Sequence, residues 1–100
     1  MGEGACELCG KITQLDTLEV HHIVPEEITS QPGVRASATA DLCQHCHQEV
    51  HDWYARNVST TAYDPYSKHF KSRPSTEIAR DYEAAYRLYA AYKQKLRGRA

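Results

Sequence analysis

The sequence has few of the residues from which hydrophobic cores are built. Among its 100 residues, Leu, Ile, Val and Phe together number sixteen, and only one of them is Phe. Such a low share accompanies disorder only when the net charge is large, and the formal net charge here is −1. We therefore expect one small folded domain in which a cross-link supplements a thin core.

Long apolar runs and targeting signals are also missing. No stretch approaches the roughly 18 apolar residues of a membrane-spanning helix. The N-terminus, MGEGACELCG, has no basic segment followed by an apolar one, and Cys6 stands where a myristoylation signal has Ser or Thr. These absences predict a cytoplasmic protein without a membrane partner, and a prokaryotic or phage origin is expected as well. In such a reducing compartment, paired cysteines hold metal more often than they form disulfides.

Charge of each sign is concentrated in a different part of the chain. Residues 1–67 carry ten acidic and three basic residues, whereas residues 68–100 carry nine basic and three acidic ones. The acidic part holds all four cysteines and five of the six histidines, which suits divalent cations. The basic part suits phosphate groups, although the solvated face of an ordinary helix has the same composition.

Periodicity and turn residues predict a mixed α+β fold. A short strand is expected at residues 18–23, and a long loop over 26–40 leads to a second short strand near 40–42. A helix is expected from His45 to Arg56. After an irregular segment, a last helix is expected over residues 76–96.

These elements divide one domain into three parts. We expect residues 1–57 to form a core stapled through its paired cysteines, residues 58–74 to form a basic irregular connection, and residues 75–100 to form a C-terminal helix. Ser75 is a candidate N-cap of that helix.

The last helix carries an apolar stripe with heptad-like spacing. Its members are Ile78, Tyr82, Ala85, Tyr89, Tyr92 and Leu96. Such a stripe usually packs on the helix's own domain, but a tyrosine-rich one also suits an interface between two copies. The sequence therefore allows a monomer or a homodimer through the C-terminal helix.

Four cysteines form two pairs with the spacing of zinc knuckles. Cys6 and Cys9, and likewise Cys43 and Cys46, place two thiolates on one tight turn, and two such turns complete a tetrahedral Zn²⁺ site. Gly10 follows the first pair, where a knuckle turn favours a residue that tolerates positive φ. A redox pair would be expected in a βαβ context, which this sequence lacks. We predict a structural Zn²⁺ on these four residues.

Four histidines form a second constellation. His21 and His22 are adjacent at the end of the first expected strand, while His47 and His51 lie on one face of the expected helix. Because His47 directly follows Cys46, the thiolate site and the histidine face point about 100° apart on that helix. The spacing predicts a second metal site, distinct from the zinc site.

The two constellations are joined by a further motif. Residues 18–25 read Leu-Glu-Val-His-His-Ile-Val-Pro, and residues 42–51 read Leu-Cys-x-x-Cys-His-x-x-x-His. With the first Cys-x-x-Cys, this combination resembles the HNH endonuclease family in its zinc-stapled form, over residues 6–51. The resemblance implies a ββα-metal (His-Me finger) core stapled by a four-cysteine zinc site. It also implies metal-dependent hydrolysis of DNA phosphodiester bonds, by nicking or cutting, with low sequence specificity.

The resemblance also implies roles for individual histidines. His22 occupies the position of the general base, and His21, His47 and His51 occupy positions that hold a catalytic divalent cation. An imidazole of ordinary pKa can accept a proton from water near neutral pH. Imidazole ligands favour Mn²⁺, Ni²⁺, Co²⁺ or Zn²⁺ over Mg²⁺, which prefers oxygen.

The middle Asn of the family pattern has no counterpart in this chain. Ala38 stands about where it is expected, five residues before the second cysteine pair. Ser37, Thr39 and Asp41 are candidates to orient His22 in its place, and the backbone of the strand is a further candidate.

Substrate contacts are expected from the basic part of the chain. Lys68, Lys71 and Arg73 form a compact candidate for binding the phosphates of DNA. Two other functions fit the same sequence: a non-catalytic zinc module that binds nucleic acid or a protein, and a dimerising interaction domain.

Overall fold

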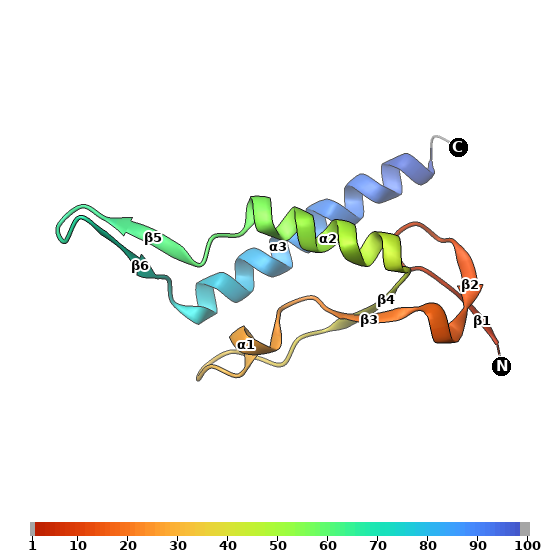
Figure 1. Ribbon diagram of the computed structural model, residues 1–100, viewed down its shortest axis with the longest axis horizontal. Helices are drawn as coiled ribbons and strands as arrows, with labels where there is room; N and C mark the ends of the chain where they lie inside the picture. Colours follow the sequence, from red (N-terminus) through yellow and green to blue (C-terminus); the bar gives the residue numbers. More distant parts are fainter. Residues whose placement is uncertain (1, 99–100) are drawn as a thin grey trace.

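The computed structural model describes residues 2–98 and has a mixed α+β fold with three separate two-stranded antiparallel sheets (Figure 1). The predicted α+β class and long C-terminal helix are confirmed. The elements in chain order are β1 (Glu3–Ala5), β2 (Ile12–Gln14), the 3-10 helix η1 (Leu15–Thr17), β3 (Glu19–His22), α1 (Glu26–Thr29), β4 (Thr39–Leu42), α2 (Gln44–Asn57), β5 (Thr61–Asp64), β6 (His69–Ser72) and α3 (Ser75–Arg97).

The first cysteine pair lies in the turn of a hairpin that the sequence did not reveal. Strands β1 and β2 pair on either side of it, and the Cys6 N–H donates to the Lys11 carbonyl at 3.0 Å. Gly10 closes the turn with φ of 76°, donating its N–H to the Cys6 carbonyl at 2.8 Å. A Cβ at Gly10 would lie 2.7 Å from the Arg97 guanidinium, the flexible end of a side chain that can move, so the positive φ is what favours glycine here.

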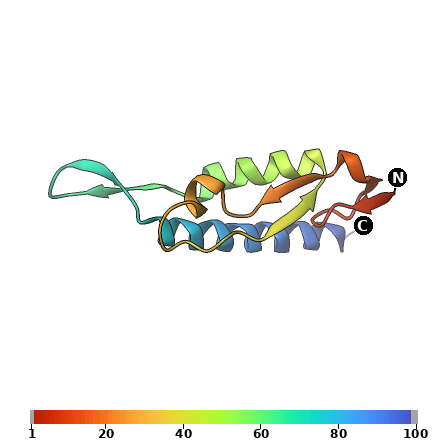
Figure 2. The ribbon, with the colours of Figure 1, turned by 90° about the horizontal axis from the view of Figure 1, so that it is seen from below.

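The centre of the molecule is a hairpin of β3 and β4 covered by α2 (Figures 1 and 2). Its register places His21 opposite Ala40 and His22 opposite Thr39. Because side chains alternate along a strand, His21 and Ala40 face α2 while His22 and Thr39 face away. The core under α2 is small and includes Leu42, Cys46, Val50 and Tyr54 together with the other buried cysteines.

The connection between β3 and β4 contains the short helix α1, where a long loop was expected. The connection is tied down at its base, next to the His22–Thr39 pair, since the Ile23 N–H donates to the Ala38 carbonyl and the Val24 N–H donates to Ser37 Oγ at 2.9 Å.

Helix α3 packs along α2 through part of the predicted stripe. Ile78, Ala85 and Tyr89 are buried and Tyr82 is half-buried, whereas Tyr92 and Leu96 remain exposed. The Trp53 indole N–H fixes the two helices by donating to the Ala85 carbonyl at 3.0 Å. The helix is preceded by Pro74 in the N-cap position, so the predicted cap at Ser75 is wrong by one residue. None of the helices within residues 2–98 combines the length and apolarity needed to span a membrane.

The prediction of an irregular connection over residues 58–74 is wrong for most of its length. Strands β5 and β6 form a hairpin that projects from one end of the molecule (Figures 1 and 2). Its strands have only four residues each, and the four-residue turn between them begins with Pro65, so the composition favours a loop. Pairing of Tyr63 with Phe70 across the strands stabilises the hairpin, and this pairing cannot be read from the local composition.

Candidate metal centres

The structure brings all four cysteines to one point between the β1–β2 turn and the start of α2. Their sulfur atoms lie within 4.8 Å of one another, and no disulfide joins them. The Cys9 and Cys43 sulfurs are 3.8 Å apart, which matches the roughly 3.8 Å edge of a tetrahedron with Zn–S bonds of about 2.3 Å. This arrangement can hold a zinc ion.

Backbone donors and cationic side chains surround the thiols. Burial raises the pKa of the Cys6 thiol, but backbone hydrogen bonds at Cys9, Cys43 and Leu8 outweigh this effect and bring the pKa down to about 6. Burial raises the pKa of the Cys43 and Cys46 thiols. The cluster therefore combines a thiol of lowered pKa with thiols of raised pKa, and all four become thiolates only when a cation offsets their negative charge.

Helix α3 supplies positive charge on the outer side of this cluster. Lys93 is only 9 % exposed and donates to Glu49 at 3.1 Å, and Tyr89 donates to the same carboxylate. Burial lowers the pKa of Lys93, but Glu49 and the nearby Cys46 thiol outweigh it, so the pKa is raised overall. A protonated Lys93 therefore offsets part of the negative charge that four thiolates would carry.

Three histidines form a second cluster between β3 and α2. The ring nitrogens of His21, His47 and His51 lie within 4.8 Å of one another. The Nε2 atoms of His47 and His51 are 3.1 Å apart, close to the 3.0–3.4 Å expected for two nitrogens that share an ion at about 2.1 Å. His21 is only 1 % exposed, whereas His51 is exposed. The cluster thus opens to solvent on one side, where further ligands can enter.

Two residues that the sequence did not indicate, Tyr54 and Glu19, determine which ring nitrogen is free in His21 and in His47. The Tyr54 hydroxyl donates to the Ile23 carbonyl at 2.9 Å, so it accepts the 3.1 Å hydrogen bond from His21 Nε2, which leaves Nδ1 of His21 free to bind an ion. Glu19 lies 2.7 Å from Nδ1 of His47, which leaves Nε2 of His47 free. Such partners orient metal-binding imidazoles and raise their basicity.

The electrostatics of this cluster favour neutral imidazoles. Burial, reinforced by the charges that His47 and His51 would carry, lowers the pKa of His21 to about 4. Burial and His47 also lower the pKa of His51. The rings of His21 and His51 are therefore in the form that binds metal at neutral pH.

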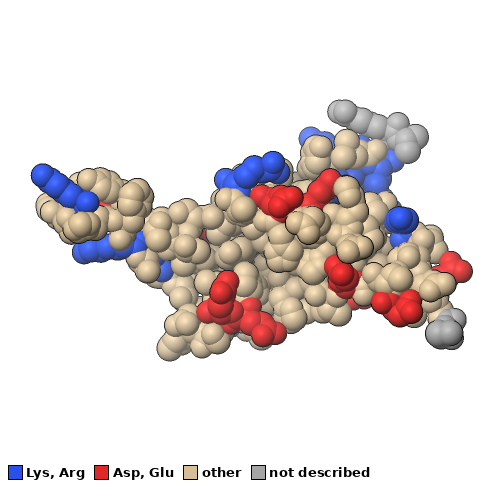
Figure 3. All heavy atoms as spheres, viewed as in Figure 1, with Lys and Arg blue, Asp and Glu red and all other residues tan. Residues whose placement is uncertain are grey.

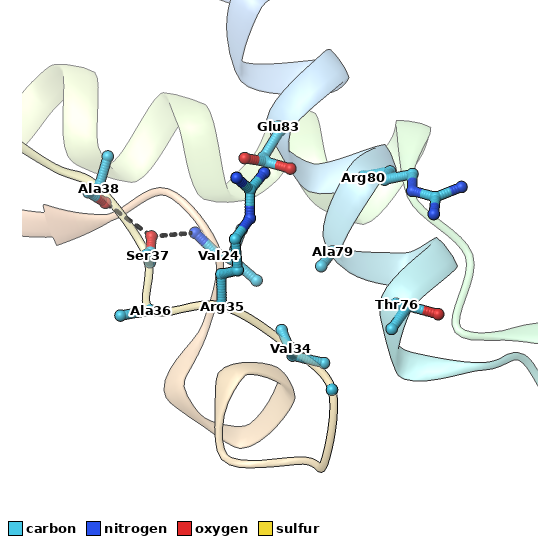
Figure 4. A pocket seen from close by; sticks show the side chains of 11 residues that line it. Val24, Val34, Arg35, Ala36, Ser37, Ala38, Thr76, Ala79, Arg80 and Glu83 are labelled. Atoms are coloured by element: carbon cyan, nitrogen blue, oxygen red, sulfur yellow. Dashed lines mark hydrogen bonds between the residues drawn. The ribbon is translucent and has the colours of Figure 1, made fainter.

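His22 lies outside this cluster, on the opposite face of β3. Its side chain is 45 % exposed, and its Nε2 atom lies 3.6 Å from Glu26 in α1. The spacing of four residues between His22 and Glu26 was the only signal of this pair in the sequence. Of the candidates to orient His22, Thr39 and Asp41 share its face of the hairpin. Ser37 instead accepts from Val24 (Figure 4).

Two of the three predicted DNA-binding residues are engaged within the chain. Arg73 donates to Asp81 at 2.6 Å and to the Ser59 carbonyl at 2.7 Å, which attaches the β5–β6 hairpin to α3. Lys71 pairs with Asp64 at 2.8 Å on the hairpin surface. Lys68 stands in the exposed turn with φ of 59°. The three residues therefore follow the projecting hairpin from its base to its tip.

A hollow of about 520 Å³ lies apart from both clusters, between the loop of residues 33–38 and the first half of α3 (Figure 4). Arg35, Arg80 and Glu83 line it together with small and apolar side chains. Its lining includes none of the predicted metal ligands, so it adds nothing to the candidate metal chemistry.

Replacing Glu19 by Gln is expected to weaken divalent-ion binding at the histidine cluster by about 10- to 100-fold. The neutral amide oxygen is a weaker acceptor for the His47 Nδ1–H than a carboxylate, and the amide NH₂ group can donate to Nδ1 instead, so the preference for a free Nε2 is reduced. Titration with Co²⁺ or Ni²⁺, followed by calorimetry, measures the effect, and Tyr54→Phe should act in the same direction through His21. Glu27, an exposed glutamate in α1, offers a control: Glu27→Gln should bind divalent ions as tightly as the wild type does. Equal affinities for Glu19→Gln and Glu27→Gln would contradict the role assigned to Glu19.

Comparison of the chain with family models, with curated proteins and with solved structures gave no match, so its likeness to a family rests on the motifs themselves.

Proposed function

We propose that this protein is a metal-dependent endonuclease of the HNH type that hydrolyses DNA phosphodiester bonds. One observation carries the proposal: residues distant in sequence, His21 in β3 and His47 and His51 in α2, converge with their nitrogens within 4.8 Å. They do so where a strand pair meets a helix, the element order of a ββα-metal core, and His22 follows His21 directly.

Each residue then has a distinct task. A divalent cation at the three histidines would neutralise charge on a phosphate oxygen and on the departing oxygen. His22, exposed on the other side of the strand, accepts the proton of the attacking water. Glu26 lies near its ring and stabilises the imidazolium that results.

The four cysteines serve the fold in this proposal. We assign them a structural Zn²⁺, because the sulfur spacing and the four thiol ligands match that ion and leave no open position. The cation at the histidines is Mn²⁺, Ni²⁺, Co²⁺ or Zn²⁺ in preference to Mg²⁺, since all three protein ligands are nitrogens.

The proposal predicts two metal ions per chain and cutting of plasmid DNA. Supercoiled plasmid is incubated with the protein and each divalent ion in turn, and nicked and linear forms are separated on a gel. A His47→Ala/His51→Ala variant should keep its zinc, lose the second ion in native mass spectrometry, and leave the plasmid intact. An intact plasmid with the wild-type protein under every ion would contradict the proposal.

A second candidate is a zinc module that binds nucleic acid or protein without catalysis. It is favoured by the residue at the family's Asn position, Ala38, and by Ser37, which bonds Val24 rather than His22. It predicts one metal ion per chain, with no dependence of plasmid integrity on Mn²⁺.

A further inference from the structure

The projecting hairpin exposes aromatic residues that nothing in the chain covers within residues 2–98. We call residues 59–73, which comprise β5, β6 and their turn, the arm. Tyr63, Tyr66 and Phe70 are 53 %, 97 % and 72 % exposed. Tyr63 and Phe70 lie side by side on one face, with ring centroids 5.4 Å apart. The Tyr63–Phe70 pair supports the hairpin across its strands, but both rings and that of Tyr66 stay largely open to solvent, and exposed aromatic surface of this kind marks an interaction site.

The arm is anchored at its base. The Arg73 N–H donates to the Thr60 carbonyl at 2.9 Å, and the Arg73 guanidinium joins Ser59 to Asp81 of α3. These bonds hold the two ends of the hairpin together and fix them to the long helix. The aromatic face is therefore presented on a supported element.

Charge on the arm indicates the chemistry of its partner. The strand register places His69 and Lys71 on the face opposite the aromatic pair, with Lys68 in the turn, against one acidic residue, Asp64. Figure 3 shows basic side chains on the arm and most acidic side chains on the body of the molecule. Exposed aromatics among basic residues match a polyanion with flat rings, which is the chemistry of nucleic acid.

We propose that the arm binds duplex DNA beside the site of cleavage. Lys68 in the turn contacts phosphate, and Tyr63, Tyr66 and Phe70 contact sugars and base edges in a groove. A two-stranded ribbon fits the major groove, which is about 12 Å wide. The choice of DNA rests on the proposed function, whereas the exposed aromatic face and its charge do not.

The distance from the histidine cluster suits a single duplex. His51 and the end of α2 at Asn57 are separated by about 9 Å along the helix axis. Residues 58–60 add up to about 10 Å where extended, and the four-residue strands and their turn add about 15–20 Å. The tip of the arm is therefore at most about 40 Å from the candidate metal site, little more than one turn of B-DNA, which is about 34 Å.

Deleting the arm tests the proposal. Residues 61–72 are replaced by Gly-Gly, which the 2.9 Å hydrogen bond between Thr60 and Arg73 permits with little change elsewhere. All proteins carry His22→Ala so that the DNA stays intact. Fluorescence anisotropy measures binding to a labelled duplex of about three helical turns.

The deletion is expected to weaken binding at least about tenfold, because it removes phosphate and groove contacts together, and the triple variant Tyr63→Ser/Tyr66→Ser/Phe70→Ser should act in the same direction. Lys68→Ala should lower the salt slope of the affinity by about one. The exposed residues Leu88 and Lys11, which lie outside the arm, give matched controls: Leu88→Ser and Lys11→Ala should bind as the parent does.

Three results would overturn the proposal: equal binding with and without the arm, no binding of DNA by the parent, or loss of a dimer in light scattering when the arm is deleted. The proposed function fails separately. If binding depends on the arm but the wild-type protein cuts plasmid under no ion, the proposed nuclease activity is wrong and the role of the arm stands. If the wild-type protein cuts plasmid but binding does not depend on the arm, the role of the arm is wrong and the nuclease activity stands.

Discussion

A Cys43→Ser variant is expected not to fold. Structural zinc contributes on the order of 10 kcal/mol to the folding of small zinc domains, which is about the whole stability of a typical domain. Serine is a poor zinc ligand, so the variant loses most of this contribution. Its far-UV circular dichroism should show a largely unfolded chain without a cooperative thermal transition.

The expected loss is large because little else holds this end of the molecule. Cys6, Cys43 and Cys46 belong to the core together with Leu8 and Leu42. The β1–β2 hairpin, with three residues in each strand, joins the rest through that cluster and a few backbone bonds such as that from Glu7 to Asp41. Without a metal, four buried or half-buried thiols remain in place of an apolar core.

Two measurements make this expectation specific to metal. A strong zinc chelator should bring the wild-type protein to the same unfolded state, and added Zn²⁺ should restore it. Thr39→Ser, an exposed change in the strand that leads to Cys43, should leave the melting temperature within a few degrees of wild type. If the Cys43→Ser protein melted cooperatively near the wild-type temperature, with or without chelator, the fold would not depend on zinc at the four cysteines.

The metal clusters could be anticipated from sequence because their ligands lie in short local motifs. Cys-x-x-Cys places two sulfurs on one turn, and residues four apart share one face of a helix. The convergence of His21 with His47 and His51 needed only the further assumption that the strand packs on the helix, and the structure brings the three together. Their role in catalysis stays a prediction.

Residues that support these ligands could not be found in the same way. Tyr54 reaches His21 from thirty-three residues away, and Glu19 reaches His47 from twenty-eight. Such contacts depend on strand register and on the rotation of α2 about its axis, which short motifs do not specify. The β5–β6 hairpin was missed for a related reason: its stability comes from cross-strand pairs and from Arg73, not from strongly strand-forming segments.

A His22→Ala variant is expected to lose about 10²- to 10⁴-fold in the rate of DNA cleavage, the contribution typical of a general base. Its metal content should stay at two ions per chain. The structure explains why chemistry and folding separate at this position: His22 is exposed and on the face of β3 opposite the cluster, and its contact with Glu26 is at the surface, at 3.6 Å. Such pairs contribute at most about 1 kcal/mol.

The chain contains a matched control for this variant. His45 is also an exposed histidine with a glutamate four residues later, since its Nε2 lies 3.1 Å from Glu49. His45→Ala should cut plasmid at the wild-type rate. Free imidazole should restore part of the activity of His22→Ala, because the position is open to solvent, but should not accelerate the His45→Ala protein. If His22→Ala cut DNA as fast as His45→Ala, the proton would have to be accepted by another group, and the assignment of His22 as general base would be wrong.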